Sequence, residues 1–174
     1  MVIIVSGAIG IGKTTICKKV MKIAQSQGYS CGGIISYKKQ YEKIIVKDIQ
    51  TGKTKILAST HNIYKGPRTA KYFFNPEGID FGNKSIDRSI SSDITFIDEL
   101  GYLELQGQGF AKSVEQVAAR AFKTSILVIR TELLTSYLLR LGAGTTVFET
   151  TLDNRNKLPD EIFQVLQRDL RVGL

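Results

Sequence analysis

A glycine-rich segment at residues 7–14 has the residue types and spacing of a phosphate-binding loop. It reads Gly-Ala-Ile-Gly-Ile-Gly-Lys-Thr and matches, at every fixed position, the pattern G-x-x-x-x-G-K followed by Ser or Thr. Glycines let consecutive backbone N–H groups turn toward one centre, and a following helix adds the positive end of its dipole, so such a loop attracts phosphate. We expect nucleotide binding by the residues of this loop: Gly7, Ala8, Ile9, Gly10, Ile11, Gly12, Lys13, Thr14 and Thr15.

Two side chains of the loop carry chemistry. Lys13 is expected to reach the β- and γ-phosphates as a catalytic residue, and the Thr14 hydroxyl to bind Mg²⁺, which neutralises the bridging phosphate oxygens. The alternative is a glycine-rich turn that happens to precede a lysine, and four fixed positions match by chance in roughly one chain in a hundred. The buried strand expected before the loop and the amphipathic helix expected after it favour the functional interpretation.

An apolar segment at residues 94–97 is followed by two acidic residues, Asp98 and Glu99. In phosphate-loop enzymes a buried strand of this kind delivers an aspartate to the metal. We therefore expect Asp98 to hold Mg²⁺ through water, and Glu99 to act as general base on a water aimed at the γ-phosphate. Taken alone, an apolar strand that ends in two acids commonly just reaches the surface, so the pairing with residues 7–14 carries this prediction.

The type of reaction is a separate question. A kinase needs an acceptor pocket and excludes water, commonly with a mobile lid that carries several arginines. The sequence has no arginine-rich insertion of that kind, which favours hydrolysis of nucleoside 5′-triphosphates such as ATP and GTP. The irregular residues 60–92 leave room for an acceptor site, so a small-molecule or nucleotide kinase stays open as an alternative.

The elements around these residues follow from hydrophobic patterns. Residues 2–5 form a short apolar run typical of a strand covered on both faces, and an apolar period near 3.6 from Lys13 to a stop at Gly28 predicts a helix. Further buried strands are expected at residues 125–129 and 145–148. Helices are expected between the strands, one on Val114, Val117, Ala118 and Ala121, one at 132–141, and one after Pro159 on Ile162, Val165, Leu166 and Leu170.

Strands and helices that alternate in this way predict an α/β fold with a mostly parallel sheet between two helical layers. Short apolar bursts in residues 32–59, with a turn at Thr51-Gly52-Lys53, add an antiparallel β-meander. Residues 60–92 contain Gly66-Pro67 and Asn75-Pro76, so we expect loops there with at most one weak helix on Ile79, Ile86 and Ile90. The expected fold class is a three-layer phosphate-loop fold with a meander extension.

Length and composition are those of an ordinary globular protein. The chain has 174 residues, 43% of them hydrophobic and 23% charged, so we expect one domain over residues 1–174 rather than a disordered or disulfide-stapled chain. No apolar run approaches the roughly 18 to 20 residues that cross a bilayer, and the apolar N-terminus is too short for a signal peptide. We expect a cytoplasmic monomer in which Cys17 and Cys31 are reduced, buried side chains.

An excess of basic residues gives a formal net charge of +8, which attracts polyanions such as nucleotides and nucleic acids. A basic face for RNA or DNA is one interpretation of Lys18, Lys19, Lys22, the stretch Tyr37-Lys38-Lys39-Gln40-Tyr41, Lys65, Arg68 and Lys71. Solvated lysines explain the same residues, and no nucleic-acid-binding motif accompanies them. A nucleotide-dependent nucleic-acid-binding module remains a second alternative, and His61, the single histidine, is expected in a loop.

Longer segments resemble the THEP-type family of small nucleoside triphosphatases. The resemblance covers nearly the whole chain and lies in VSGAIGIGKTT, GGIISYKK, KYFFNPEGIDFG, IDELGYLEL and LDNRNKLPDEI. It implies a RecA-like α/β fold and slow, Mg²⁺-dependent hydrolysis of nucleoside triphosphates to diphosphates with broad base tolerance. It also implies Lys13 and Thr14 at phosphate and metal, Asp98 and Glu99 at metal and water, and Asn154 and Arg155 near the nucleotide base.

Two arginines have alternative interpretations. Arg155 follows the strand expected at 145–148, where a guanidinium can stack on a base or simply be solvated. Arg130 ends a central strand, where it can act on the γ-phosphate as an arginine finger or form an ordinary salt bridge.

Three departures from the family pattern surround the expected site: Ser36-Tyr37-Lys38 in place of an acidic pair, Tyr102 in place of lysine, and Val128-Ile129-Arg130-Thr131 in place of a strand end like Thr-Ile-Pro.

Overall fold

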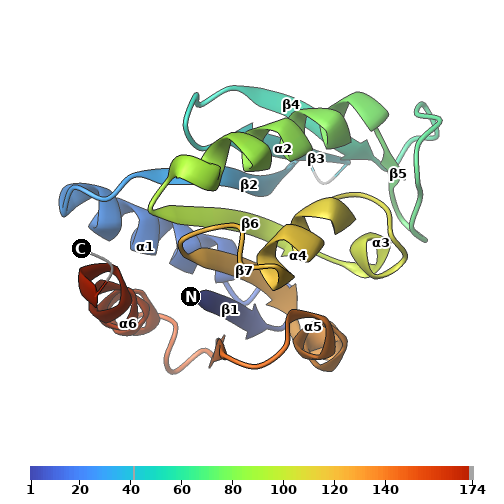
Figure 1. Ribbon diagram of the computed structural model, residues 1–174. Coiled ribbons are helices and arrows are strands. Elements are labelled where there is room, and N and C mark those ends of the chain that lie inside the picture. Colours follow the sequence, from blue (N-terminus) through green and yellow to red (C-terminus); the bar gives the residue numbers. More distant parts are fainter. Residues whose placement is uncertain (41, 173–174) are drawn as a thin grey trace.

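A computed structural model describes residues 1–40 and 42–172, and an eight-stranded sheet runs through the described residues (Figure 1). The strands are β1 (Val2–Gly7), β2 (Cys31–Lys39), β3 (Lys43–Asp48), β4 (Thr54–Ser59), β5 (Phe73–Phe74), β6 (Ile94–Leu100), β7 (Ser125–Arg130) and β8 (Thr145–Glu149). Their order is β5-β4-β3-β2-β6-β7-β1-β8. The pairs from β2 through β6, β7 and β1 to β8 are parallel, whereas β3, β4 and β5 pair antiparallel. The mostly parallel sheet and its meander extension are confirmed.

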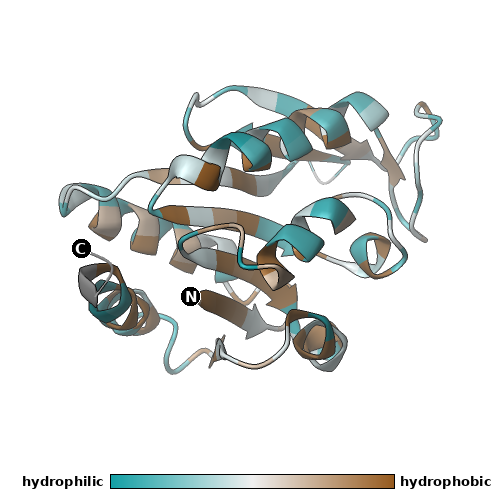
Figure 2. Ribbon diagram, in the orientation of Figure 1, coloured by the Kyte–Doolittle hydropathy of each residue, from teal (hydrophilic) through white to brown (hydrophobic). Residues whose placement is uncertain are grey.

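Helices cover both faces of this sheet. The helices are α1 (Lys13–Ser26), α2 (Pro76–Arg88), α3 (Tyr102–Leu105), α4 (Ala111–Ala118), α5 (Leu134–Leu141) and α6 (Leu158–Val172). Ile3 and Val5 of β1 belong to the core beneath α1 and α6, whereas Val2 and Ile4 belong to the core beneath α2, α4 and α5. Figure 2 shows the apolar sides of these helices turned toward the sheet. Because successive strand residues point to opposite faces, the unbroken apolar run of β1 supplies both cores.

Residues 60–92 are more regular than the sequence predicts. They contain β5 and a full helix, α2, whereas we expected loops and at most one weak helix. The Asn75-Pro76 pair predicts a loop, but in the structure the Asn75 side chain accepts a hydrogen bond from the Glu77 N–H and Pro76 occupies the first turn of α2. Both residues have these roles at helix starts, so the pair begins α2. A side chain at Gly78 would collide with the backbone of β4, so this glycine lets α2 lie close to the sheet.

Helix α4 is shorter than predicted. It carries Val114, Val117 and Ala118, but it ends before Ala121. The following Arg120 has a left-handed backbone with φ of 58°, which stops the helical hydrogen-bond pattern. The helix expected at 132–141 begins as a 3₁₀ turn at Thr131–Leu133 and continues as α5. Within the described part of the chain, each helix is too short or too polar to span a membrane.

Candidate phosphate and metal site

The glycine-rich segment forms a loop between the end of β1 and the start of α1. Gly7, at the end of β1, pairs in register with Arg130 at the end of β7. Gly12 has φ of 112°, a conformation that side chains other than glycine rarely adopt, and it precedes α1 directly. The first turn of α1 has neither a capping side chain nor an acidic residue. The N–H groups and dipole of this helix end are therefore left for an anion.

Lys13 lies folded back over the loop that precedes it. Its Nζ donates hydrogen bonds to the carbonyl oxygens of Gly7 at 2.7 Å and Ala8 at 2.6 Å. The residue is 8% exposed. Burial lowers the pKa of Lys13 most strongly and nearby Arg130 lowers it further, although Glu99 and Asp98 act in the opposite direction. An ammonium in this position is close to the loop amides and faces two carboxylates.

Asp98 joins the end of β6 to the start of α1. Its carboxylate accepts hydrogen bonds from the Thr14 hydroxyl at 3.0 and 3.2 Å and from the Ser36 N–H at 3.1 Å. Asp98 is 1% exposed. Burial raises its pKa to about 7, with a further contribution from Glu99, although the hydrogen bonds from Ser36 and Thr14 oppose the rise. The carboxylate is thus buried and hydrogen-bonded, but no cation contacts it in the described part of the chain.

This donor set fits a magnesium ion. The Asp98 carboxylate and the Thr14 hydroxyl supply two adjacent oxygens, and the Ser36 hydroxyl beside them is buried without a hydrogen-bond partner among the described residues. No group of three or more His, Cys, Asp or Glu side chains gathers anywhere in residues 1–40 and 42–172. Mg²⁺ suits such a site because it binds through one or two protein oxygens and completes its shell with phosphates and water.

Glu99 has an unusual backbone. Its φ is 62°, and the register between β6 and β7 shifts between Ile97 and Leu100. This left-handed residue coincides with the register shift near the end of β6, where Asp98 is buried and Glu99 is exposed. A residue held in this conformation costs about 1 kcal/mol or more, and such strain is concentrated at functional sites. The sequence predicted the pair of acids but not this turn.

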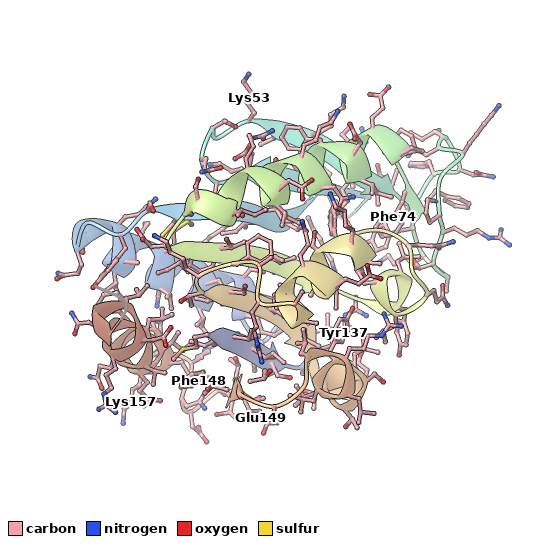
Figure 3. The ribbon with its side chains drawn as sticks, viewed as in Figure 1. Lys53, Phe74, Tyr137, Phe148, Glu149 and Lys157 are labelled. Carbon is pink, nitrogen blue, oxygen red and sulfur yellow. The ribbon has the colours of Figure 1, made fainter. Side chains whose placement is uncertain are left out.

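A buried glutamate that the sequence analysis assigned no role holds the segment after Glu99. The Glu104 carboxylate accepts hydrogen bonds from the N–H groups of Gly101 at 2.8 Å and Phe110 at 3.0 Å. The Tyr137 hydroxyl donates to the Gly101 carbonyl at 2.7 Å. Figure 3 labels Tyr137 on α5, which packs beside this segment. Glu104 is the second glutamate of the segment IDELGYLEL, so the family motif could have pointed to this residue. The sequence could not show what the residue contacts.

Asn154 and Arg155 lie in the loop between β8 and α6. The Asn154 side chain accepts a hydrogen bond from the Thr151 N–H at 2.8 Å and donates one to the Glu149 carbonyl at 2.8 Å. Asn154 therefore shapes the loop itself. Arg155 is exposed, as either interpretation of this residue requires. The structure brings this loop next to the phosphate loop, because the Thr150 N–H donates to the Ser6 carbonyl at 2.7 Å.

The other residues weighed from the sequence are dispersed. Arg130 is half-exposed, and its guanidinium nitrogen lies 3.9 Å from a carboxylate oxygen of Glu132. It is also near enough to Lys13 to lower the pKa of that lysine. The Lys18 ammonium lies 5.8 Å from the ring centre of Tyr37, so these two residues of the suggested basic face lie side by side. The lysines and Arg68 of the suggested basic face are exposed, and Tyr41 lies outside the described residues. His61 is in a loop, exposed, 3.5 Å from Glu42.

Both cysteines are buried and unpaired, as predicted. Burial raises the pKa of Cys31 to about 12, with a contribution from Asp93, and burial also raises the pKa of Cys17.

The chain is similar over nearly its whole length to known proteins. The model of a protein family described as NTPase matches residues 2–163. A nucleoside-triphosphatase THEP1 from Methanosarcina acetivorans is 32% identical over 174 residues, which cover 97% of this chain and 98% of the relative. The THEP1 of Thermotoga maritima is 31% identical, with 96% of each chain covered. The crystal structure of THEP1 from Aquifex aeolicus superposes with a TM-score of 0.76 at 25% identity, covering 95% of this chain and 99% of that one.

Proposed function

Because the chain belongs to the NTPase family, whose model it matches over residues 2–163, we propose that it hydrolyses nucleoside 5′-triphosphates to diphosphates and phosphate. The observation that carries this proposal is the joining of Thr14, in the phosphate loop, to the buried Asp98 at the end of β6. Full-length relatives named nucleoside-triphosphatase support the same activity. ATP and GTP are the expected substrates, and other bases are expected to be accepted.

The phosphate groups are proposed to lie in the loop of residues 7–15. The N–H groups at the start of α1 point toward an anion there, and Lys13 leaves the carbonyls of Gly7 and Ala8 to contact the β- and γ-phosphates. Exchanging neutral carbonyl partners for phosphate oxygens strengthens the hydrogen bonds of an ammonium. The loop thus exchanges an internal contact for a substrate contact.

Thr14 and Asp98 are the proposed holders of Mg²⁺, with Asp98 acting through water. Bound there, the ion neutralises charge on the phosphate oxygens during transfer. The chain's own part is to present an uncharged hydroxyl and a buried carboxylate on one side of the loop. The Ser36 N–H keeps that carboxylate oriented.

Glu99 is the proposed general base. Its side chain is exposed beside Lys13, where a water can lie between the carboxylate and the γ-phosphate. The water oxygen attacks phosphorus, the bond from phosphorus to the β,γ-bridging oxygen breaks, and the proton of the water passes to Glu99. Asp98 and Glu99 are consecutive residues of β6, and the first is buried whereas the second is exposed.

Asn154 and Arg155 are proposed to lie near the nucleotide base. Asn154 would hold the shape of the loop, and the Arg155 guanidinium would stack on the base.

We further propose that residues 1–174 act as a single-domain monomer in the cytoplasm. The two unpaired, buried thiols support a reducing compartment.

Phosphate release from ATP with Mg²⁺ tests the proposed function. The wild-type protein is expected to release one phosphate per nucleotide, and Lys13→Ala to lose binding of a fluorescent ATP analogue together with turnover. Lys22→Ala is the matched control, because Lys22 is an exposed lysine on the same helix, farther along the chain from the loop. Turnover in Lys13→Ala at the wild-type rate would contradict the assignment of this loop.

A further inference from the structure

A cavity of about 460 Å³ opens beside the phosphate loop. At the loop end it is lined by Lys13, Glu99 and Arg130, the groups that face the expected γ-phosphate. From there it extends beneath the loop that precedes β5. Its volume lies in the range of small-molecule sites, about 300 to 1,000 Å³. It is far larger than the single water that hydrolysis consumes.

The walls of the cavity are largely apolar. They include Leu57 of β4, Phe74 of β5, Leu103 of α3 and Phe110, the residue before α4. Figure 3 labels Phe74, on β5. Ile9, also in the lining, is 65% exposed, so part of the apolar wall is in contact with water at a cost of about 25 cal/mol per Å². Hydrolysis alone does not call for it, whereas a ligand with an apolar body would cover this surface.

Basic side chains border the same cavity. Lys38 and Lys71 line it in addition to Arg130 and Lys13, whereas Glu99 and the buried Glu104 are its acidic lining residues. Lys71 lies over the ring of Tyr72, with 5.5 Å between Nζ and the ring centre. The cavity thus combines an apolar, ring-lined wall with lysines at its border, which suits an anionic molecule with a flat apolar body.

The cavity does not coincide with the expected position of the nucleotide base. Residues 151–157 are absent from its lining. In the sheet, β6 and β8 lie on opposite sides of β1, separated from each other by β7 and β1. Figure 3 shows Phe74 and Glu149 well apart, Phe74 in the upper right part of the view and Glu149 at the lower edge. A triphosphate whose base lies near Asn154 and Arg155 therefore directs its last phosphate toward the cavity and leaves the cavity empty.

From this placement, which rests on the proposed function, we propose that the cavity binds a second substrate and that the protein also transfers the γ-phosphoryl group to it. The substrate class is a small alcohol with an aromatic or similar flat apolar body and an anionic group. The hydroxyl oxygen bonds to the γ-phosphorus, the bond from phosphorus to the β,γ-bridging oxygen breaks, and the hydroxyl proton passes to Glu99. The products are a phosphate monoester and a nucleoside diphosphate, and water takes the same place when the cavity is empty.

Two probe alcohols test this second activity in the intact protein. With ATP and Mg²⁺, para-(hydroxymethyl)benzoate carries the ring, the anion and the hydroxyl, whereas benzyl alcohol lacks the anion. Phosphorus NMR distinguishes the monoester from inorganic phosphate. We expect the rate of monoester formation to saturate as the concentration of para-(hydroxymethyl)benzoate rises. Benzyl alcohol should need a higher concentration to reach half of its maximal rate. No monoester with either probe, or formation that rises linearly without saturation, would overturn the proposal.

Two cavity variants localise the effect. Ala70→Trp places a ring in the cavity from an exposed loop position, and we expect about a tenfold loss of monoester formation with phosphate release in the absence of probe unchanged. Lys71→Glu should raise the half-saturating concentration of para-(hydroxymethyl)benzoate about fivefold and leave that of benzyl alcohol unchanged. Ala119→Trp, at an exposed position outside the lining, is the matched control.

The same assay separates the two proposals. Monoester formation that persists equally in Ala70→Trp would overturn the assignment to this cavity. Phosphate release without monoester would overturn the second activity and leave the proposed hydrolysis intact. Monoester without phosphate release in the absence of probe would contradict the proposed hydrolysis and support the second activity.

Discussion

The Thr14 hydroxyl donates hydrogen bonds to both carboxylate oxygens of Asp98, at 3.0 and 3.2 Å, across 84 residues of sequence. This contact fixes the start of α1 against the end of β6. Because β7 lies between β1 and β6 in the sheet, no backbone pairing makes this connection. The proposed metal site is therefore assembled by side chains in the folded chain.

Thr14→Val removes the hydroxyl with little change in volume. We expect the concentration of Mg²⁺ that half-saturates phosphate release to rise about 10- to 100-fold, because the site loses one oxygen and Asp98 loses a partner. Thr54→Val is the control, since Thr54 is an exposed threonine on β4, outside the phosphate loop. A magnesium titration of phosphate release measures both variants. An unchanged titration in Thr14→Val would remove Thr14 from the metal site.

Glu99 offers a test of backbone strain at the site. Glu99→Gly relieves the left-handed backbone, so we expect it to be more stable than Glu99→Gln by about 1 kcal/mol, although both lack the carboxylate. Urea unfolding of the two variants gives this difference. Glu132 is not among the residues with positive φ. There the glycine variant should be less stable than the glutamine variant, because glycine only adds conformational freedom to the unfolded chain. A Glu99→Gly variant less stable than Glu99→Gln would argue against strain.

Glu104 is expected to hold the segment after Glu99. In Glu104→Gln one of the two N–H donors, of Gly101 or Phe110, loses its acceptor, so the free energy of unfolding should fall by about 1–3 kcal/mol. Turnover should fall as well, because the position of Glu99 depends on this segment. Glu115→Gln, an exposed change on α4, is expected to alter neither quantity. Thermal unfolding and phosphate release of the two variants check the prediction, and equal stability would contradict it.

An ion pair between the buried Asp48 and the half-exposed Arg88 gives the fold a pH dependence. Burial alone would raise the pKa of Asp48, but hydrogen bonds from Arg88, Thr51 and Ser85 outweigh it and hold the pKa below its ordinary value. The charged form therefore stabilises the fold above the unfolded-state pKa of about 3.9, and this contribution is lost as pH falls through the lower folded-state pKa.

The corresponding variant is Asp48→Asn. At pH 7 it should lower the free energy of unfolding by about 2 kcal/mol, and the difference should shrink as the pH falls below about 4. Glu77→Gln, which removes one side of the exposed pair with Lys55, serves as the control and should leave the melting temperature nearly unchanged. Denaturation curves at several pH values measure the trend. A constant difference down to acid pH would contradict the assigned cause.

Local patterns were enough to predict the phosphate loop and the central strands. The spacing of Gly12, Lys13 and Thr14 is enough to predict a phosphate-binding loop. The continuous apolar runs of β1, β6 and β7 predict strands that are covered on both faces, as in a buried parallel sheet. Asp98 was found because it ends such a run. The motifs already favoured hydrolysis of nucleoside triphosphates, and the family resemblance added the placement of Asn154 and Arg155 near the base.

Other features depend on contacts between distant elements. Asn75-Pro76 is compatible with both a loop and a helix start, and only the packing of Gly78 against β4 decides for the helix. Glu104 meets its partners through the backbone of Gly101 and Phe110, and the side chain of Tyr137 comes from α5. The cavity likewise exists only where elements distant in the chain meet, so residue types alone could not locate it.

The most direct test of the central claim is phosphate release with Mg²⁺ and each of ATP, GTP, CTP and UTP, by the wild-type protein and Glu99→Gln side by side. We expect one phosphate per nucleotide from the wild-type protein. Glu99→Gln should keep nucleotide binding while its kcat falls by about 10²–10⁴. Unchanged turnover in Glu99→Gln would contradict the assignment of Glu99 as general base, and no release of phosphate by the wild-type protein would contradict the proposed hydrolysis itself.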